Sequence, residues 1–320
     1  MKTFTIGKKK IVLKEEWMVG FITTWIVGLL AHAYRFFNFL PIWDSIYNFT
    51  GVGSTYTLGR WFLGYAGLIT SMFDLPWVNG AFSLFYISIV VILLTEMFEI
   101  KNKGMIVLCA AIFVSFPTVV SSFAYMYTAD AYLLAFLLAT LAVYLTWCVK
   151  KWGTIAGMVC LAFAMGIYQA YATVAIVLVL LYIIRQFVIE KLDFLEAVRK
   201  DLKYLGMLVG GAVLYAVILK ITLIRYNITL PGYQGIGALG IMSLGQYKAA
   251  LQKTLYHFRL ILGMEHGVEK RVYSILNASV LLLIGLIFIY LLIRNQVYKK
   301  KMSMLASIAA VSYTHLRAHE

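Results

Sequence analysis

Apolar segments close to twenty residues long are the feature that most restricts how this chain folds. Six of them lie at residues 17–34, 78–98, 105–123, 130–149, 204–224 and 275–293. A helix needs about 20 apolar residues to cross the hydrocarbon core of a bilayer. Because 62% of the residues are hydrophobic and only 13% are charged, the chain carries more apolar surface than a soluble domain buries. This balance excludes a soluble enzyme, a disordered chain and a nucleic-acid-binding domain.

A further apolar segment, residues 154–189, is too long for one crossing. As a single helix it would extend about 54 Å, against a hydrocarbon core of roughly 30 Å. We therefore expect a hairpin of two spans that turns near Gly166–Tyr171. The sequence thus predicts an all-α fold, a polytopic transmembrane helix bundle with about eight complete spans in residues 1–301.

Residues 61–73 are also apolar, but so short a run suits an outer interfacial helix better than a span. The distribution of basic residues decides whether this segment crosses the membrane, because cytoplasmic loops of membrane proteins are enriched in Lys and Arg. If residues 61–73 do not cross, most of the 28 Lys and Arg fall on one side, at 2–14, 101–103, 150–151, 185–203 and 294–301. The sequence therefore predicts a multi-pass protein of the plasma or inner membrane, with a cytoplasmic N-terminus and outer loops at 35–77 and 225–274.

The last residues, 302–320, differ from the rest. A new apolar run lasts only ten residues and then gives way to SYTHLRAHE. We interpret this as a truncated span followed by an artefact tail, so the chain is expected to lack its final spans. Metal binding through His315 and His319, four residues apart, is the alternative. No cofactor follows from the sequence, and a divalent metal stays open.

Asp44 is the only acid of the first outer loop before Asp74. A carboxylate close to the membrane surface acts as a general base when a neighbouring cation or hydrogen bond sets its pKa. The alternative is structural, because Asp is also a favoured N-cap for a short helix.

Gly59-Arg60-Trp61 opens the expected interfacial helix. Arg binds phosphate bidentately, and the N-terminal end of a helix attracts anions. Arg60 and Trp61 are therefore candidate substrate-binding residues. A snorkelling Arg beside an interfacial Trp anchor would explain the same tripeptide.

Two further segments complete a pattern: Tyr127-Thr-Ala-Asp130-Ala-Tyr132 and Gly166-Ile-Tyr168-Gln169-Ala-Tyr171. Together with a first span, an outer acid and the GRW tripeptide, they resemble the type II O-antigen glucosyltransferase family. These are integral membrane glycosyltransferases of the GT-C fold class. The resemblance covers roughly residues 17–190, and a lone Asp44 stands where family members often carry more than one acid.

The resemblance implies a transfer of glucose, or a related hexose, from a polyprenyl-phosphate donor to a cell-surface polysaccharide or another envelope acceptor on the outer face. It implies that Asp44 is the base and that Asp130 orients the acceptor or a metal. Arg60 would face the phosphate, and Tyr168 and Gln169 would line the sugar or donor pocket. The alternatives are a helix N-cap for Asp130 and an interfacial aromatic turn for Tyr168 and Gln169.

The second outer loop contributes one more candidate. Residues 243–263 have apolar side chains at three- and four-residue spacing, with Arg259 on another face. Such a helix can lie on the outer leaflet, where Arg259 would contact carrier phosphate. A surface helix packed on the bundle is the alternative.

Two other functions compete with a transferase. A transporter or flippase is expected to have ionisable residues in the middle of its spans or two related halves. The predicted spans carry almost no ionisable residues away from their ends, and the sequence shows no internal repeat. A polysaccharide polymerase or ligase that handles lipid-linked sugars would have a larger outer loop with several Arg residues, which residues 225–274 match in part.

Overall fold

The computed structural model describes residues 2–6, 9–47, 55–70, 73–230 and 268–317, with a few isolated positions between 231 and 267. The two strands are β1 (Lys2–Ile6) and β2 (Lys9–Leu13). The α-helices are α1 (Glu15–Phe37), α2 (Trp43–Tyr47), α3 (Leu63–Ala66), α4 (Pro76–Met97), α5 (Lys103–Ser115), α6 (Pro117–Ser122), α7 (Met126–Cys148), α8 (Gly153–Ile167), α9 (Ala172–Arg185), α10 (Phe194–Tyr226), α12 (Val268–Arg294) and α13 (Lys301–Arg317). Short 3-10 turns are η1 (Tyr56–Leu58), η2 (Gly67–Thr70), η3 (Phe123–Tyr125), η4 (Gln169–Tyr171) and η7 (Val297–Lys299), and η5 (Gln186–Glu190) is a π-helical turn.

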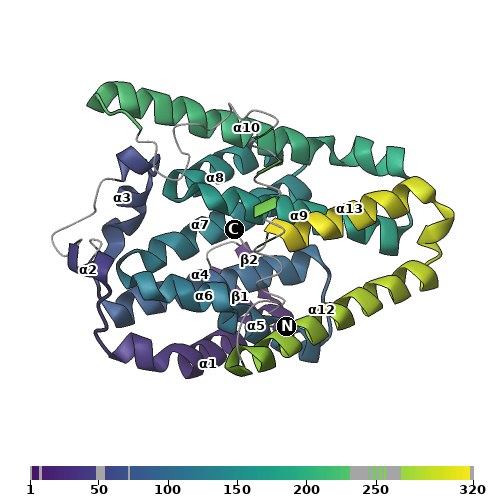
Figure 1. Cartoon of the computed structure of the whole chain (residues 1–320), viewed down its shortest axis with the longest axis horizontal. Coiled ribbons are helices and arrows are strands. Elements are labelled where there is room, and N and C mark those ends of the chain that lie inside the picture. The colour runs from purple at the N-terminus through teal and green to yellow at the C-terminus, as the bar shows by residue number, and fades with distance from the viewer. Residues whose placement is uncertain are drawn as a thin grey trace. The chain divides into compact units, whose positions relative to one another are not determined.

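These elements form two compact units. The first comprises Met1–Ala175 and Lys203–Pro231, and the second comprises Ile176–Leu202 and Gly232–Glu320. Helices α1 to α8 and most of α10 therefore belong to the first unit (Figure 1). Every described candidate site residue lies in the first unit.

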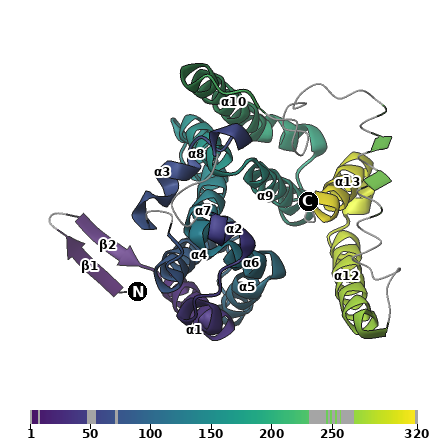
Figure 2. The same ribbon diagram turned by 60° about the vertical axis from the view of Figure 1, so that its left-hand side comes forward.

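The first unit is a helix bundle organised around α4 and α7. Helix α7 packs against α4 and α8, and α1 packs against α4 and α5 (Figure 2). Close approach is allowed by small residues: a Cβ at Gly28 would collide with Leu84, and one at Gly157 would lie 2.7 Å from the Ala142 carbonyl. The core between these helices consists of Phe36, Leu84, Ile87, Val91, Ala110, Val114, Val119, Phe123, Met126, Ala129 and Leu133.

A break between α5 and α6 follows directly from the sequence. Phe116 has extended backbone (ψ 141°), as expected for a residue that precedes a proline. Helix α6 then restarts with Pro117 at its first turn, where the missing N–H costs nothing. This bend and the turn η3 divide residues 103–148, so α5 can pack on α1 while α7 packs on α4.

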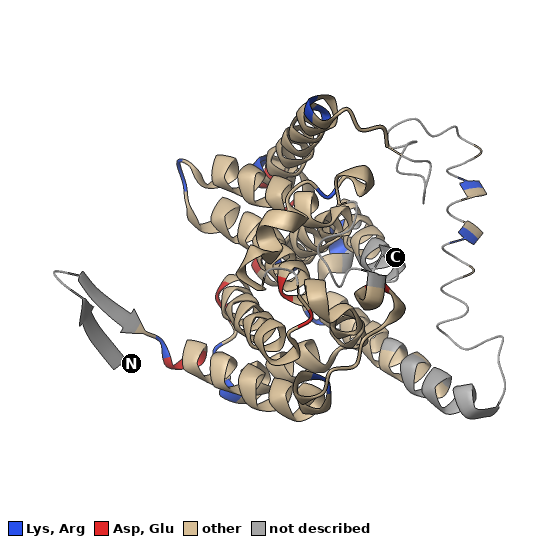
Figure 3. Cartoon of the chain, turned by 90° about the vertical axis from the view of Figure 1, so that its left-hand side faces the viewer, with Lys and Arg blue, Asp and Glu red and all other residues tan. Residues whose placement is uncertain are grey.

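Within the described residues, five helical segments are long and apolar enough to cross a membrane: Glu15–Phe37, Pro76–Met97, Lys103–Cys148, Gln169–Glu190 and Phe194–Tyr226. Two shorter apolar helices cover Gly153–Ile167 and Ala278–Arg294. The chain is thus helical and membrane-like, and charged residues are sparse on the described helices (Figure 3). The expected count of eight spans is not confirmed. The predicted turn near Gly166–Tyr171 is present, since α8 ends at Ile167 and α9 begins at Ala172.

The interfacial helix expected over 61–73 is shorter than predicted, and its place at the membrane surface stays a prediction. The described residues form only the four-residue helix α3 and the turn η2. Glycines at 59, 64 and 67 lower the helix propensity of this segment. Trp61, Leu63 and Ala66 are buried, whereas Tyr65, Leu68 and Ile69 are exposed. The segment therefore packs part of its apolar surface on the protein and leaves the rest exposed.

The N-terminus forms a short antiparallel hairpin, which an all-α fold did not include. Strands β1 and β2 pair from Lys2 opposite Leu13 to Ile6 opposite Lys9. The hairpin immediately precedes α1, and the rest of the described chain is helical.

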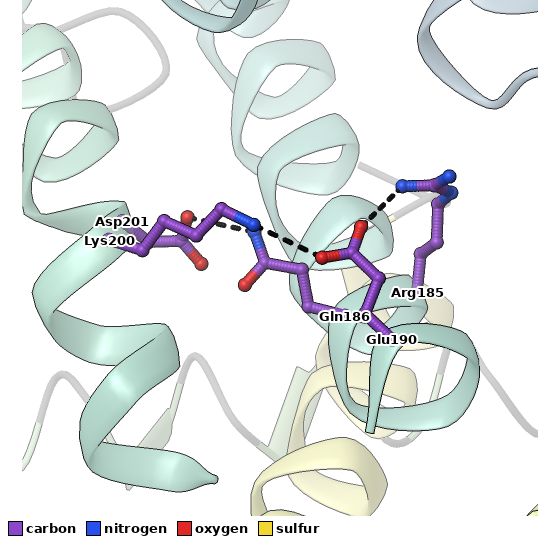
Figure 4. A network of polar contacts seen from close by, with 5 residues as sticks. All are labelled: Arg185, Gln186, Glu190, Lys200 and Asp201. Atoms are coloured by element: carbon purple, nitrogen blue, oxygen red, sulfur yellow. Dashed lines mark hydrogen bonds and ion pairs between the residues drawn. The ribbon is translucent and has the colours of Figure 1, made fainter. Parts of the chain in front are cut away.

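The second unit has a polar network at the junction of α9 and α10 (Figure 4). Glu190 accepts from Arg185 at 2.6 Å and from Lys200 at 3.1 Å, and Gln186 donates to Asp201 at 3.1 Å. A cavity of about 440 Å³ lies beside it, lined almost entirely by apolar side chains of α9, α10 and α13. The network joins two consecutive helices within a basic segment.

Candidate functional site

Arg60 lies in a tight turn between η1 and α3, and aromatic side chains hold its guanidinium. Its Nη1 donates to the Tyr132 hydroxyl at 3.1 Å, and its Cζ lies 4.4 Å from the centre of the Tyr168 ring. The Tyr132 and Tyr168 rings stack with centroids 5.6 Å apart. Arg60 is half-buried and forms no ion pair with any described residue. The described chain therefore presents a fixed cation without an anionic partner.

The structure brings the GRW tripeptide and the Gly166–Tyr171 segment together, although about a hundred residues separate them. The Phe62 amide donates to the Gly166 carbonyl at 2.8 Å, and Gln169 Nε2 donates to the Leu58 carbonyl at 2.8 Å. A Cβ at Gly166 would lie 2.7 Å from the Trp61 ring, so only glycine permits this approach. Two motifs that the resemblance treated separately thus form one structure.

Trp61 packs its side chain into the helix bundle next to this turn. It is 7% exposed and belongs to a cluster with Ala162, Tyr215 and Leu219. Its ring meets Phe163 edge-on at 5.3 Å. The interfacial anchor suggested for Trp61 is therefore wrong, and its contact with a substrate stays a prediction.

Asp44 lies in the first turn of α2 and is exposed, while its neighbour Ser45 is buried. Tyr127, at the start of α7, interacts electrostatically with both Asp44 and Arg60. That Asp44 and Arg60 form one functional site stays a prediction.

Asp130 has a separate set of contacts. It is 2% exposed, and its two carboxylate oxygens accept from Thr70 at 3.1 Å and from Asn79 at 3.0 Å. The alternative of a helix N-cap is wrong, because α7 begins at Met126. Asp130 instead joins η2, α4 and α7, and its catalytic role stays a prediction. Among the described residues no three His, Cys, Asp or Glu side chains converge, so no metal ligand set can be named.

Asp74 and Arg35 are oppositely charged residues at the two ends of segment 35–77, and they interact electrostatically. Arg35 donates to the carbonyl oxygens of Phe123 at 2.8 Å, of Ala124 at 3.2 Å and of Leu40. Burial raises the pKa of Asp74, while Arg35 and Ser45 act in the opposite direction. This group ties the loop, and with it α2, to the bundle.

Replacing Asp74 with Asn is expected to change how stability depends on pH. A carboxyl whose folded pKa is raised stabilises the fold below its unfolded pKa of about 3.9 and loses this contribution as pH rises through the folded pKa. We therefore subtract the melting temperature of Asp74→Asn from that of the original protein. This difference should decrease as the pH is raised from about 4 to neutral. Thermal unfolding in detergent measures both melting temperatures. A difference that grows with pH would mean that the Arg35 pairing outweighs burial.

Sequence reasoning missed the tyrosines that shape this site. The motif of residues 127–132 contains Tyr127 and Tyr132 but predicts no role for them, and no pattern in the sequence indicates Tyr215 on α10. Polar ring hydroxyls inside apolar helices were the available signal, because buried hydroxyls need partners. Arg259 and most of the predicted helix 243–263 lie outside the described residues.

Comparison with known proteins identifies a family. A family model described as "Glucosyl transferase GtrII" matches residues 33–316. No curated protein and no solved structure gives a significant match. The match covers most of the chain and includes Asp44, the Arg60 turn and the Tyr168–Gln169 turn. The chain therefore belongs to the glucosyl transferase GtrII family and is a membrane glycosyltransferase.

Proposed function

We propose that this glycosyltransferase moves glucose, or a related hexose, from a polyprenyl-phosphate donor to a surface polysaccharide or another envelope acceptor. The site would lie on the outer face of the plasma or inner membrane. The positive-inside rule supports this side, because the basic clusters gather in the loops opposite residues 35–77.

The observation that carries the proposal is the cation of Arg60, which forms no ion pair with the described residues. Its guanidinium is half-buried, and its Nε is buried without a hydrogen-bond partner among the described residues. A charge withdrawn from water is costly unless an opposite charge meets it. A phosphate offers two oxygens to the guanidinium fork. A lipid-linked phosphate is the anion that a turn between membrane helices can reach.

The proposed chemistry uses Asp44 and Arg60. Asp44 accepts the proton of an acceptor hydroxyl, whose oxygen then attacks C1 of the donor hexose. The bond between C1 and the phosphate oxygen breaks, and the electron pair leaves with the lipid phosphate. Arg60 stabilises the negative charge that develops on the phosphate. Because this charge is larger in the transition state than in the bound donor, the barrier to transfer is lowered. Tyr132 and Tyr168 hold Arg60 in place for that step.

A transfer assay in sealed vesicles of known orientation tests the proposal. Labelled polyprenyl-phosphate glucose and labelled nucleotide glucose are offered separately with envelope acceptor. We expect incorporation only from the lipid donor, and only when acceptor is present on the outer face. Incorporation from nucleotide glucose would contradict the lipid donor. Movement of intact donor across the membrane without transfer would favour a flippase, and chain growth from lipid-linked repeat units would favour a polymerase.

A further inference from the structure

We infer that Tyr215 and Gln169 are positioning residues, which fix the Leu58–Arg60 turn so that Arg60 meets the donor phosphate. This inference rests on the proposed role of Arg60. Neither side chain would touch the reacting atoms. Tyr215 was not a candidate from the sequence, and Gln169 was expected to line the sugar pocket.

Two hydrogen bonds join these side chains to consecutive carbonyls of the turn, and a third joins the side chains to each other. Tyr215 donates its hydroxyl to the Gly59 carbonyl at 3.0 Å. Gln169 Nε2 donates to the Leu58 carbonyl at 2.8 Å and to the Tyr215 hydroxyl at 2.9 Å. An amide nitrogen carries only two hydrogens, and both are engaged here. Gln169 therefore has no amide hydrogen left to donate to a sugar.

The backbone of the turn is shaped for this contact. Gly59 has φ +71°, in the left-handed region that favours glycine. A Cβ at this position would lie 2.6 Å from Gln169 Nε2 and 2.8 Å from the Tyr215 hydroxyl. Glycine is thus needed both for the conformation and for the close approach. Tyr215 is 5% exposed, so its hydroxyl bonds form away from water.

The same contacts control where Arg60 points. On the N-terminal side its amide donates to the Thr55 carbonyl at 2.9 Å, and on the C-terminal side Phe62 is bound to Gly166. Tyr168, whose ring lies under the guanidinium, directly precedes Gln169. One turn between α8 and α9 therefore supports both the backbone and the side chain of Arg60. Loosening the backbone would displace the cation even though every Arg60 atom remained.

The first test measures the turn itself. Tyr215→Phe removes one hydroxyl and keeps the ring that packs against Trp61, and Gln169→Met is a second variant that keeps similar volume. Tyr204→Phe is the matched control, because Tyr204 is equally buried on the same helix, about 16 Å away along its axis. Hydrogen exchange of a peptide over residues 55–62 should become faster in both test variants and not in the control. Unchanged exchange in both would overturn the inference.

The second test asks whether the effect passes through Arg60. We expect Tyr215→Phe to raise the KM for the lipid donor by about five- to tenfold, with a smaller change in the KM for acceptor. In an Arg60→Ala background the same substitution should change donor kinetics less than about twofold, because the positioned group is gone. Equal effects in both backgrounds would mean a general structural role and would overturn the inference.

Failure of the proposed function gives a different result. If Arg60→Ala by itself left donor kinetics unchanged, Arg60 would not bind the donor phosphate. Positioning of Arg60 by Tyr215 and Gln169 would then have no role in transfer. The exchange measurement would then still report whether the Tyr215 and Gln169 contacts hold the turn.

Discussion

Replacing Asp44 with Asn is expected to lower the rate of hexose transfer by about a hundredfold or more. The amide keeps the size and the hydrogen-bonding shape of the side chain but accepts no proton. Because Asp44 is exposed on the short helix α2, the substitution should leave the fold intact. Initial rates with saturating lipid donor and acceptor measure the loss.

Asp193→Asn is the matched control, because this acid is also exposed, with 71% of its side chain accessible. It lies between α9 and α10, far from Asp44 in the sequence, and should transfer at the original rate. Melting temperatures of both variants should stay close to that of the original protein. Unimpaired transfer by Asp44→Asn would remove Asp44 as the base and direct attention to another acid, with Asp130 the next candidate.

Replacing Arg60 with Ala is expected to lower kcat/KM for the lipid donor by about a hundred- to a thousandfold. The variant loses the cation that meets the phosphate, both in the bound donor and in the transition state. Arg60→Lys keeps the charge without the planar fork, so it should retain an intermediate activity. Steady-state kinetics with varied donor concentration separate the two effects, since lost binding raises KM and lost transition-state stabilisation lowers kcat.

Arg225→Ala is a suitable control for this prediction. Arg225 is exposed at the end of α10 and lies in the same unit as Arg60. It should change donor kinetics by less than about twofold, as expected for a solvated surface charge. If Arg225→Ala and Arg60→Ala reduced transfer equally, general charge attraction would explain both, and a specific phosphate site at Arg60 would be contradicted.

The sequence predicted the class of fold well and its details less well. Apolar run lengths located the helices and the turn between α8 and α9, because the thickness of a bilayer fixes the length of a crossing. The same reasoning was incomplete at residues 61–73. There Trp61 and Leu63 pack against the protein, whereas Leu68 and Ile69 are exposed. Hydrophobicity alone does not distinguish lipid from protein as the apolar partner.

The candidate site was predictable only in parts. Arg60 and Tyr168 were both proposed, yet nothing in a linear sequence indicated that the Tyr168 ring would lie under the Arg60 guanidinium. Asp130 was grouped with Asp44 because both are rare acids near the outer ends of helices. Helical geometry separates the contacts of Asp130 from those of Tyr132, since residues two apart on a helix face nearly opposite directions. Tyr215 was missed because its partner Gly59 lies far away along the chain.

Binding of the released carrier is the most direct test of the site. A short-chain polyprenyl phosphate is titrated into the purified protein, with the non-phosphorylated polyprenol as the control ligand. We predict saturable binding of the phosphate that weakens at least about tenfold in Arg60→Ala and persists in Arg225→Ala. Equal affinity of the original protein and Arg60→Ala for the phosphate, or equal affinity for the polyprenol, would contradict a lipid-phosphate site at Arg60.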